Sequence, residues 1–478
     1  MIILGTNSIK DTGFDVANSA RFGVNTYMHK AFSSDNEKDT WTFSLWVKRG
    51  NSGSTQRMMT HNGATSGKFF YLRWESNEQL HFHIGMSDGN YAAFDTTQVF
   101  RDHSAWYHIV CAVDTTQGTE ANRVKIYVNG SQLTAFGTAN YPAQNTTASI
   151  GRTDTPMVVG ALYGSGYGIT SGSPQEYYDG YLAEVCFIDD AQLAADSFGE
   201  FDSDSGIWKP INVSGLTFGT DGFYLDFEDS GNLGNDANGG TDLTEVNLAA
   251  TDQSTDTCTN NFSTYNPLQV QVGTANEPVF RDGNLTIHGS STGSIHFHAP
   301  STIGVTQGKW YAEFKGGSAS NENGMVGVTY DPGEDARNDD YPGQQSHSYG
   351  YYVNGNKYTG DSASSYGDAW TTDIIGVALD LDNHKLYFSK NGVFQNSGDP
   401  TSGATGTGSA FSLTTGQTYF FATGDGNATY INPFEANFGS PPYAISSGNT
   451  DGDGYGNFEY AVPSGYYALC TKNLAEYG

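Results

Sequence analysis

WTFSLWV at residues 41–47 alternates side chains between two faces of an extended chain. One face carries Trp41, Phe43, Leu45 and Val47, and the other carries Thr42, Ser44 and Trp46. A period of two is typical of a β-strand, and an apolar set on one face indicates burial of that face. We therefore predict a long strand here with one side in a hydrophobic core.

Further strand patterns follow on both sides of this stretch. FFYLRW (69–74) and LHFHIGM (80–86) are separated by four polar residues, which predicts a hairpin. WYHIVCAVD (106–114) precedes VKIYVNG (124–130), whose Asn129-Gly130 pair favours a type I′ turn. YLAEVCFID (181–189) is the last clear strand of this half, and residues 191–201 are compatible with one short helix.

The second half has a strand pattern of its own. Its main predicted strands lie at 309–314, 325–330, 348–353, 373–381 and 385–392, with a final strand at 465–471 in an otherwise loop-like tail. IIGVALDLDNHKLYFSKNG (374–392) resembles the pair at 108–130, since each joins an apolar strand to a strand that ends in Asn-Gly. The sequence predicts an all-β protein with two tandem antiparallel β-sandwiches.

Composition agrees with this fold class. Glycine contributes 60 of 478 residues, and aromatic residues make up 14% of the chain. Glycine, Asn and Asp favour turns, whereas Tyr, Phe, Trp and Thr favour strands. A polar, turn-rich stretch at 229–277 is interpreted as a loop-rich connector. We therefore expect a first domain at 1–228, a second domain at 278–445 and a C-terminal tail at 446–478.

Charge excludes two classes of partner. The chain has 52 acidic and 22 basic residues, for a formal net charge of −30. So few cations cannot form a large basic patch, which argues against nucleic acid and against anionic membranes as partners. No apolar run approaches 18 residues, and the first residues do not resemble a secretory signal. We expect no membrane insertion.

The four cysteines are far apart and form no C-x-x-C motif. This spacing disfavours a disulfide framework or a zinc ribbon. Cys111 and Cys186 lie in apolar strand patterns, so we expect both to be buried thiols.

Two families resemble parts of this chain. WTFSLWVKRG (41–50), WYHIVCAVDTTQ (106–117), VKIYVNGSQL (124–133) and residues 179–201 resemble the LamG-like, concanavalin A-like jelly-roll family over roughly 1–205. GKWYAEF (308–314), GMVGVT (324–329), SYGYYVNGNKYT (348–359) and residues 373–392 resemble the SPRY family over roughly 278–440. The resemblance implies two β-sandwich domains of families that bind glycans or proteins.

The combination also resembles structural proteins of marine tailed bacteriophages. FGEFDSDSGIWKP (198–210) and the tail at 455–478 carry this resemblance. It implies a virion protein, as a fibre, tail or capsid-decoration component, assembled in the host cytoplasm and released by lysis. It also implies that further modules follow the tail in such proteins. The partners would be other virion proteins, further copies of the chain, and a host surface glycan or receptor.

The sequence motifs that could indicate catalysis or zinc binding are weak. Glu200, Asp202 and Asp204 are the nearest approach to the paired carboxylates of a glycosidase, but they follow the main strands. His81 and His83 share one strand face, and so do His296 and His298. Paired histidines can bind zinc, but the sequence supplies no evident third ligand, so we interpret both pairs as solvated sheet faces. We expect a non-enzymatic protein.

Calcium is a more plausible metal than zinc, because oxygen ligands are plentiful in this sequence. Asp451-Gly452-Asp453-Gly454 resembles part of an EF-hand loop, although Tyr460 stands where that loop needs Glu. The jelly-roll resemblance also implies Ca²⁺ at the rim of the first domain, without assigned ligands. The other interpretation is a plain acidic turn.

Carbohydrate binding needs flat aromatic faces beside polar groups, and two loops supply them. The first, at 162–180, contains Tyr163, Tyr167, Tyr177, Tyr178 and Asp179. The second, at 330–350, contains Tyr341 and Tyr349, with Trp370 nearby. Either loop could instead pack on its own sandwich or on a neighbouring subunit.

These observations favour a virion protein that presents carbohydrate- or receptor-binding domains for host adhesion. Three alternatives remain open: a purely structural decoration or fibre component, a polysaccharide-degrading enzyme, and a secreted cellular lectin.

Overall fold

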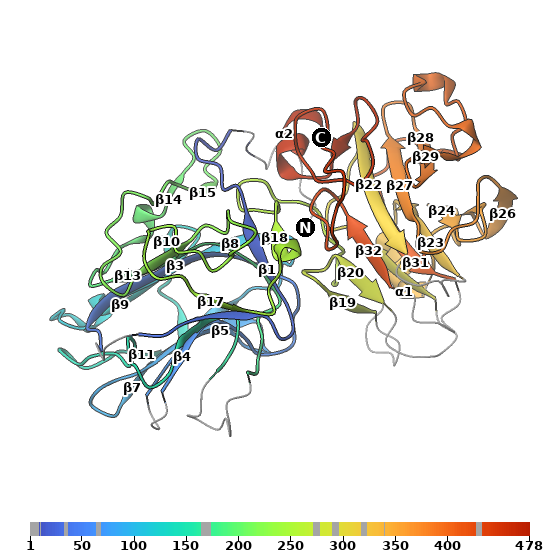
Figure 1. The fold of residues 1–478 in the computed structure, drawn as a ribbon. Coiled ribbons are helices and arrows are strands. Elements are labelled where there is room, and N and C mark those ends of the chain that lie inside the picture. The colour runs from blue at the N-terminus through green and yellow to red at the C-terminus, as the bar shows by residue number, and fades with distance from the viewer. Residues whose placement is uncertain are drawn as a thin grey trace. The chain divides into compact units, whose positions relative to one another are not determined.

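The computed structural model describes residues 9, 11–32, 37–63, 68–163, 174–270, 278–288, 296–316, 323–338, 340–426 and 433–478. Contacts within the chain divide it into two compact units, with Thr12–Thr259 as the first unit and Asn260–Gly478 as the body of the second. The secondary structure is nearly all β, in antiparallel sheets, as predicted (Figure 1). No helix in the described ranges is long and apolar enough to cross a bilayer.

Two sheets form the first unit. Sheet A has the order β10 (Ser131–Gln132), β9 (Val124–Val128), β8 (Trp106–Asp114), β3 (Thr40–Arg49), β13 (Gly180–Asp189), β1 (Ser19–Phe22) and β18 (Gln253–Ser254), with β16 (Phe223–Leu225) beside β13. Sheet B has the order β11 (Phe136–Asn140), β7 (Tyr91–Val99), β6 (Gln79–Gly85), β5 (Phe69–Trp74), β4 (Gln56–Asn62), β12 (Met157–Val159), β2 (Tyr27–Lys30) and β17 (Thr244–Val246). A separate hairpin joins β14 (Gly199–Phe201) to β15 (Trp208–Pro210).

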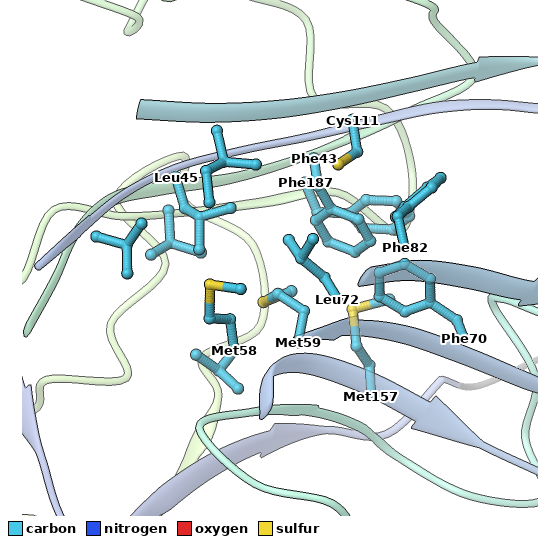
Figure 2. Close-up of a cluster of buried hydrophobic side chains, with 14 of the residues drawn as sticks. Phe43, Leu45, Met58, Met59, Phe70, Leu72, Phe82, Cys111, Met157 and Phe187 are labelled. Carbon is cyan, nitrogen blue, oxygen red and sulfur yellow. The ribbon is translucent and has the colours of Figure 1, made fainter. Parts of the chain in front are cut away.

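The hydrophobic core of this unit lies between the two sheets. Figure 2 shows Phe43, Leu45 and Phe187 of sheet A pointing toward Phe70 and Leu72 of sheet B. Stacked and edge-on aromatic pairs fill it, with the rings of Phe43 and Phe187 4.7 Å apart. Because alternate residues of each strand enter this core, the predicted period of two at 41–47 is confirmed.

The outer faces of the two sheets differ. The outer face of sheet A is covered by apolar clusters, one built with residues 191–224 and one with residues 14–16 and 258. Trp46, predicted to face away from the core, lies in the second of these clusters. The outer face of sheet B has a small apolar cluster of Phe69, Tyr71 and Leu162 among polar side chains. Sheet A is therefore buried on both faces. The outer face of sheet B is buried at β4 and at Phe69 and Tyr71 of β5, and is partly exposed along β6 and β7.

The predicted hairpins are confirmed in both units. β5 pairs with β6, and β8 pairs with β9. Asn129 and Gly130 both have positive φ, 48° and 77°, as a type I′ turn requires. Asn391 and Gly392 repeat this with φ of 49° and 78° in the second unit. The Asn-Gly pair therefore forms the same type of turn in both sandwiches.

Two sheets also form the second unit. Sheet C has the order β19 (Val279–Arg281), β20 (Thr286–His288), β32 (Phe434–Asn437), β22 (Lys309–Gly316), β27 (Ile374–Asp380), β28 (Lys385–Lys390) and β29 (Val393–Phe394), with β30 (Phe411–Ser412) beside β28 and β33 (Tyr467–Ala468) beside β22. Sheet D has the order β21 (Phe297–Pro300), β31 (Phe420–Asp425), β23 (Gly324–Thr329), β24 (Ser348–Tyr352), β25 (Asn356–Thr359) and β26 (Ser362–Ser365). Helix α1 (Pro332–Asn338) follows β23, and helix α2 (Thr471–Tyr477) ends the chain.

The predicted connector at 229–277 is not a separate segment. Leu233 and Leu243 belong to the core of the first unit, and β17 and β18 extend its two sheets. Tyr265, in contrast, is fully buried in the core of the second unit. The division falls between Thr259 and Asn260. The prediction of a connector was wrong because β17 and β18 are edge strands. Edge strands pair through backbone groups, which need no apolar sequence pattern.

The predicted tail at 446–478 is also part of the second unit. β33 runs parallel to β22, and α2 follows where the sequence predicted loop. The buried Glu313 carboxylate accepts hydrogen bonds from the backbone N–H groups of Glu459 and Tyr460 (2.9 and 2.8 Å). Burial raises the pKa of Glu313 to about 7. One buried carboxylate on β22 therefore holds the tail in place.

The structure also tests the predicted short helix and the predicted buried thiols. The helix predicted at 191–201 is a single 3-10 turn at Ala195–Ser197 followed by β14. Cys111 and Cys186 are buried thiols, as expected, and burial raises both thiol pKa values. Each cysteine is free.

Candidate binding face on sheet B

The outer face of sheet B gathers aromatic, basic and imidazole side chains. They come from alternate positions of five strands, since the intervening residues point into the core. Its members, as named below, are Tyr27, His29, Arg57, Tyr71, Arg73, His81, His83, Tyr91 and Asp95. We call this set the sheet B face. In the described part of the chain, apolar clusters cover the outer side of sheet A instead.

Three tyrosines meet at the β2 end of this face. The rings of Tyr27 and Tyr163 stack with centroids 6.1 Å apart and an interplanar angle of 24°. Burial raises the pKa of Tyr27, and the nearby Tyr163 and Tyr177 hydroxyls raise it further. All three are half-buried, so part of each side chain remains accessible. Flat aromatic faces of this kind can stack on a sugar ring.

Ion pairing and backbone hydrogen bonds fix the described ends of the loop, which carry Tyr163 and Tyr177. Arg57 on β4 donates from Nε to the Glu176 carboxylate (2.5 Å), and its backbone N–H donates to the Glu176 carbonyl (3.0 Å). The Arg57 guanidinium also lies 4.2 Å from the centre of the Tyr71 ring. At the base of the loop, Leu162 and Gln175 exchange backbone hydrogen bonds. The described ends of the loop are therefore held against sheet B.

A group of two histidines and one aspartate lies on β6 and β7. His83 Nε2 is 2.6 Å from Asp95 Oδ1, and His81 Nδ1 is 3.0 Å from the same oxygen. Burial lowers the pKa of His81. Burial alone would raise the pKa of Asp95, but hydrogen bonds from His83 and Thr138 lower it. The structure thus brings to the first histidine pair the third group that the sequence did not show.

The other predicted residues of the first loop have different places. Tyr178 is fully buried, and its hydroxyl donates to the carbonyl of Lys48 (2.6 Å). Asp179 is half-buried, and its backbone carbonyl accepts a hydrogen bond from Gly50 (2.9 Å). Tyr167 lies outside the described residues. Tyr178 is therefore a core residue rather than a ligand contact, because it continues the inward set of sheet A.

The second predicted loop is packed into its own sandwich. Trp370 and Tyr349 are 2% and 6% exposed, and both belong to the core between sheets C and D. Tyr341 is also buried, and its hydroxyl donates to Asp361 (2.7 Å). These positions correct the prediction, since the rings fill the interior instead of facing a ligand.

Buried hydrogen bonds hold this loop. The Asp335 carboxylate on α1 accepts from the Thr329 hydroxyl (2.6 Å) and contacts His347 Nε2 (2.7 Å). His298 lies 3.6 Å from the same carboxylate and is buried. The second histidine pair, His296 and His298, is therefore not a solvated face as predicted. Phe297 and Ala299 face the core, and His298 is buried on the opposite side of β21 because α1 covers that side.

The calcium prediction for the tail does not fit the structure. Asp451 Oδ1 accepts the backbone N–H groups of Asp453 and Tyr455, and Oδ2 accepts from Ala468 and Asn473. Asp453 accepts a hydrogen bond from the Tyr477 hydroxyl (3.0 Å). Four N–H donors occupy the Asp451 oxygens that a cation would need. Asp451 organises a turn and joins it to the end of the chain.

The carboxylates that came nearest to a glycosidase pair in the sequence lie on and beside the β14–β15 hairpin. Glu200 is exposed and lies 3.3 Å from the Lys209 ammonium, which is also 3.6 Å from Asp202. Hydrogen bonds from Ser205 lower the pKa of Asp202. This pattern suits a surface ion cluster, whereas a general acid needs a raised pKa.

Sequence reasoning missed Tyr27, Arg57, Tyr91 and Asp95. Tyr91 is 54% exposed at the start of β7, on the same face as Asp95. Each residue stands at an outward position of its own strand, and that much could be found from the period of two. Their proximity depends on the strand order β7-β6-β5-β4-β12-β2, which no local pattern contains.

Comparison with known proteins agrees with the two sandwiches. Residues 18–196 match the model of the concanavalin A-like lectin/glucanases superfamily, and residues 308–424 match that of the SPRY domain. No curated protein matches the chain in sequence.

Solved structures with similar parts are distant. The SPRY domain of human HERC1 is 18% identical with a TM-score of 0.29, covering 36% of this chain and 96% of that chain. A candidate carbohydrate-binding protein from Bacteroides ovatus is 16% identical with a TM-score of 0.31, covering 48% and 58%. A heptameric pentraxin from Limulus polyphemus is 16% identical with a TM-score of 0.25, covering 38% and 80%. The assignment rests on the two family models: the chain carries a concanavalin A-like domain followed by a SPRY domain.

Proposed function

We propose that this chain is a non-enzymatic recognition protein that binds surface carbohydrate through the sheet B face. The observation that supports this most is the tyrosine group of Tyr27, Tyr163 and Tyr177, half-buried beside polar side chains on the uncovered sheet of a lectin-like domain. Aromatic rings supply stacking surfaces for sugars, and the half-buried His29 supplies a nearby polar group for hydroxyls.

The setting that we propose is a bacteriophage virion, in a fibre, tail or capsid decoration. It rests on the resemblance of residues 198–210 and 455–478 to phage structural proteins. Many copies on one particle would turn weak single contacts into firm attachment to a host surface, because linked sites raise the effective concentration of one another. The strongly acidic chain suits a polysaccharide target better than a nucleic acid.

The test is glycan-array and host-cell binding by the full chain, multimerised on a carrier. We expect binding to host-type glycans that drops at least tenfold in Tyr163→Ala and Tyr177→Ala. Phe201→Ala is the matched control, because Phe201 is an exposed ring on the β14–β15 hairpin, away from sheet B.

Two outcomes would contradict the proposal. Binding that survives both tyrosine substitutions would remove the sheet B face from recognition. Absence of binding by the folded, multimerised chain would favour the alternative of a purely structural component.

A further inference from the structure

The group of His81, His83 and Asp95 has the arrangement of a metal site. His81 and His83 are two residues apart on β6, so both rings leave the sheet on its outer side. Asp95 on β7 is the register partner of His81. One donor atom from each residue lies within 4.8 Å of the other two. Two adjacent strands thus hold three donors in fixed positions, independent of any loop.

The surroundings support a defined site. Neither ring nitrogen of His81 makes a hydrogen bond to a described residue, although both nitrogens are buried. Its Nδ1 lies 3.0 Å from Asp95 Oδ1 and 3.7 Å from Glu75 Oε1. Thr138 hydrogen-bonds Asp95 from the neighbouring strand β11. A hydrogen-bonded solvated face would explain His83 and Asp95. It would not explain His81, whose Nδ1 lies near two carboxylates without a hydrogen bond and whose Nε2 has no hydrogen-bond partner among the described residues.

The donor set selects a class of ion. Two imidazoles and one carboxylate suit zinc and similar divalent transition metals, whereas calcium takes oxygen ligands. Tetrahedral zinc keeps neighbouring ligand atoms about 3.3 Å apart, at metal–ligand distances near 2.0 Å. The 2.6 and 3.0 Å separations to Asp95 therefore need to open by about 0.7 and 0.3 Å, within reach of small side-chain rotations.

We propose that His81, His83 and Asp95 bind one divalent transition-metal ion of the Zn²⁺ type. Three protein ligands leave one coordination position for solvent or another ligand. The side chains of the three residues are 14%, 21% and 21% exposed, so an ion can enter from the outer side of sheet B. This proposal is independent of the carbohydrate proposal, since it needs none of the three tyrosines.

The test uses the full chain stripped of metal with EDTA and then dialysed. Isothermal titration with Zn²⁺ measures affinity and stoichiometry, Co²⁺ reports coordination through its visible absorption, and thermal unfolding measures stabilisation. We expect one Zn²⁺ per chain and a higher Tm with Zn²⁺, because a ligand that binds the folded state stabilises it. His83→Gln and Asp95→Asn should each lower the affinity at least about tenfold.

His29→Gln is the matched control, because His29 is on the sheet B face but on β2, four strands from β6. It should retain the affinity and the rise in Tm, and circular dichroism should show that all variants are folded. The proposal is overturned if the unaltered chain takes up no Zn²⁺. It is equally overturned if folded His83→Gln and Asp95→Asn bind Zn²⁺ as tightly as the His29→Gln control.

Discussion

Sheets A and B of the first unit form the same core but have different outer faces. Sheet A is covered on its outer side by residues 191–224 and by residues near both ends of the unit, and the buried Lys48–Asp256 ion pair joins this cover to β3. Sheet B carries an outer face of tyrosine, arginine and histidine side chains. The contrast suggests that sheet A stabilises the domain while sheet B is available for recognition. Each prediction below tests this division.

The largest effect is expected at Asp256, which joins the cover to sheet A. Its carboxylate accepts from Lys48 Nζ (2.6 Å) and Trp106 Nε1 (3.0 Å), and both ions of the pair are 1% exposed. Asp256→Ala would leave the Lys48 ammonium buried without this counter-ion, so we expect a loss of about 3–5 kcal/mol. Urea unfolding measures it, with the exposed Asp88→Ala as control. A loss below about 1 kcal/mol would contradict the structural role of the cover.

The next comparison uses one tyrosine from each outer face. Tyr181 on sheet A is fully buried against Trp106, whereas Tyr91 on sheet B is 54% exposed. Tyr181→Ala should cost about 3 kcal/mol of unfolding free energy because it leaves a cavity. Tyr91→Ala should change it by no more than about 0.5 kcal/mol. Equal losses in urea midpoints would mean that the two faces do not differ.

A pH-dependent effect is expected at Glu184, which lies in the irregularity of β13 with φ of 49°. Burial raises its pKa to about 7, from an ordinary value near 4.5. The folded state therefore binds the proton more tightly, and the stability that this contributes below pH 4.5 is lost as pH rises through 7.

Glu184→Gln should remove this loss, which amounts to about 3 kcal/mol. The Tyr224 hydroxyl, 2.7 Å from the carboxylate, can keep its hydrogen bond to the amide oxygen. Urea unfolding of both proteins from pH 4 to 8 measures the difference. Parallel pH curves for the two proteins would refute a perturbed carboxyl group in sheet A.

The smallest effect is expected at Glu176, which ties residues 174–178, the described end of the first tyrosine loop, to Arg57 of β4. Its side chain is 35% exposed, although that of its partner Arg57 is 4% exposed. Glu176→Gln should lower global stability by no more than about 0.5–1 kcal/mol, as partly exposed ion pairs contribute little. Hydrogen exchange at residues 174–178 should nonetheless increase. A loss above about 2 kcal/mol would indicate that sheet B also depends on its outer layer.

Local patterns predicted much of the fold. The period of two at 41–47 assigned each side chain to its face, and Asn129-Gly130 predicted a turn that the structure confirms. These features depend on neighbours within a few residues, because side-chain direction and turn geometry are local properties of the backbone. The two families were also recognisable from short motifs at 41–50 and 373–392.

The candidate site depended on contacts between distant residues. Tyr163 and Tyr177 were predicted, but Tyr27 joins them only because β2 lies beside β12 in sheet B. Tyr178, Tyr349 and Trp370 are buried, whereas Tyr163 and Tyr177 are half-buried, although the local sequences look equally suitable for a binding loop. An aromatic residue in a polar loop carries no signal of which surface it will meet.

The amino-acid sequence by itself determined the class of the protein: an acidic, all-β chain with two sandwiches that are built largely from hairpins. Tertiary structure alone decided that residues 233–246 complete the first unit, that Asp451 is a hydrogen-bonding centre, and that Asp95 stands between His81 and His83. The physical reason is that strand order and cross-strand register arise from the packing of the whole domain. A residue's own neighbours in sequence specify its direction, whereas its partners in space are specified by the fold.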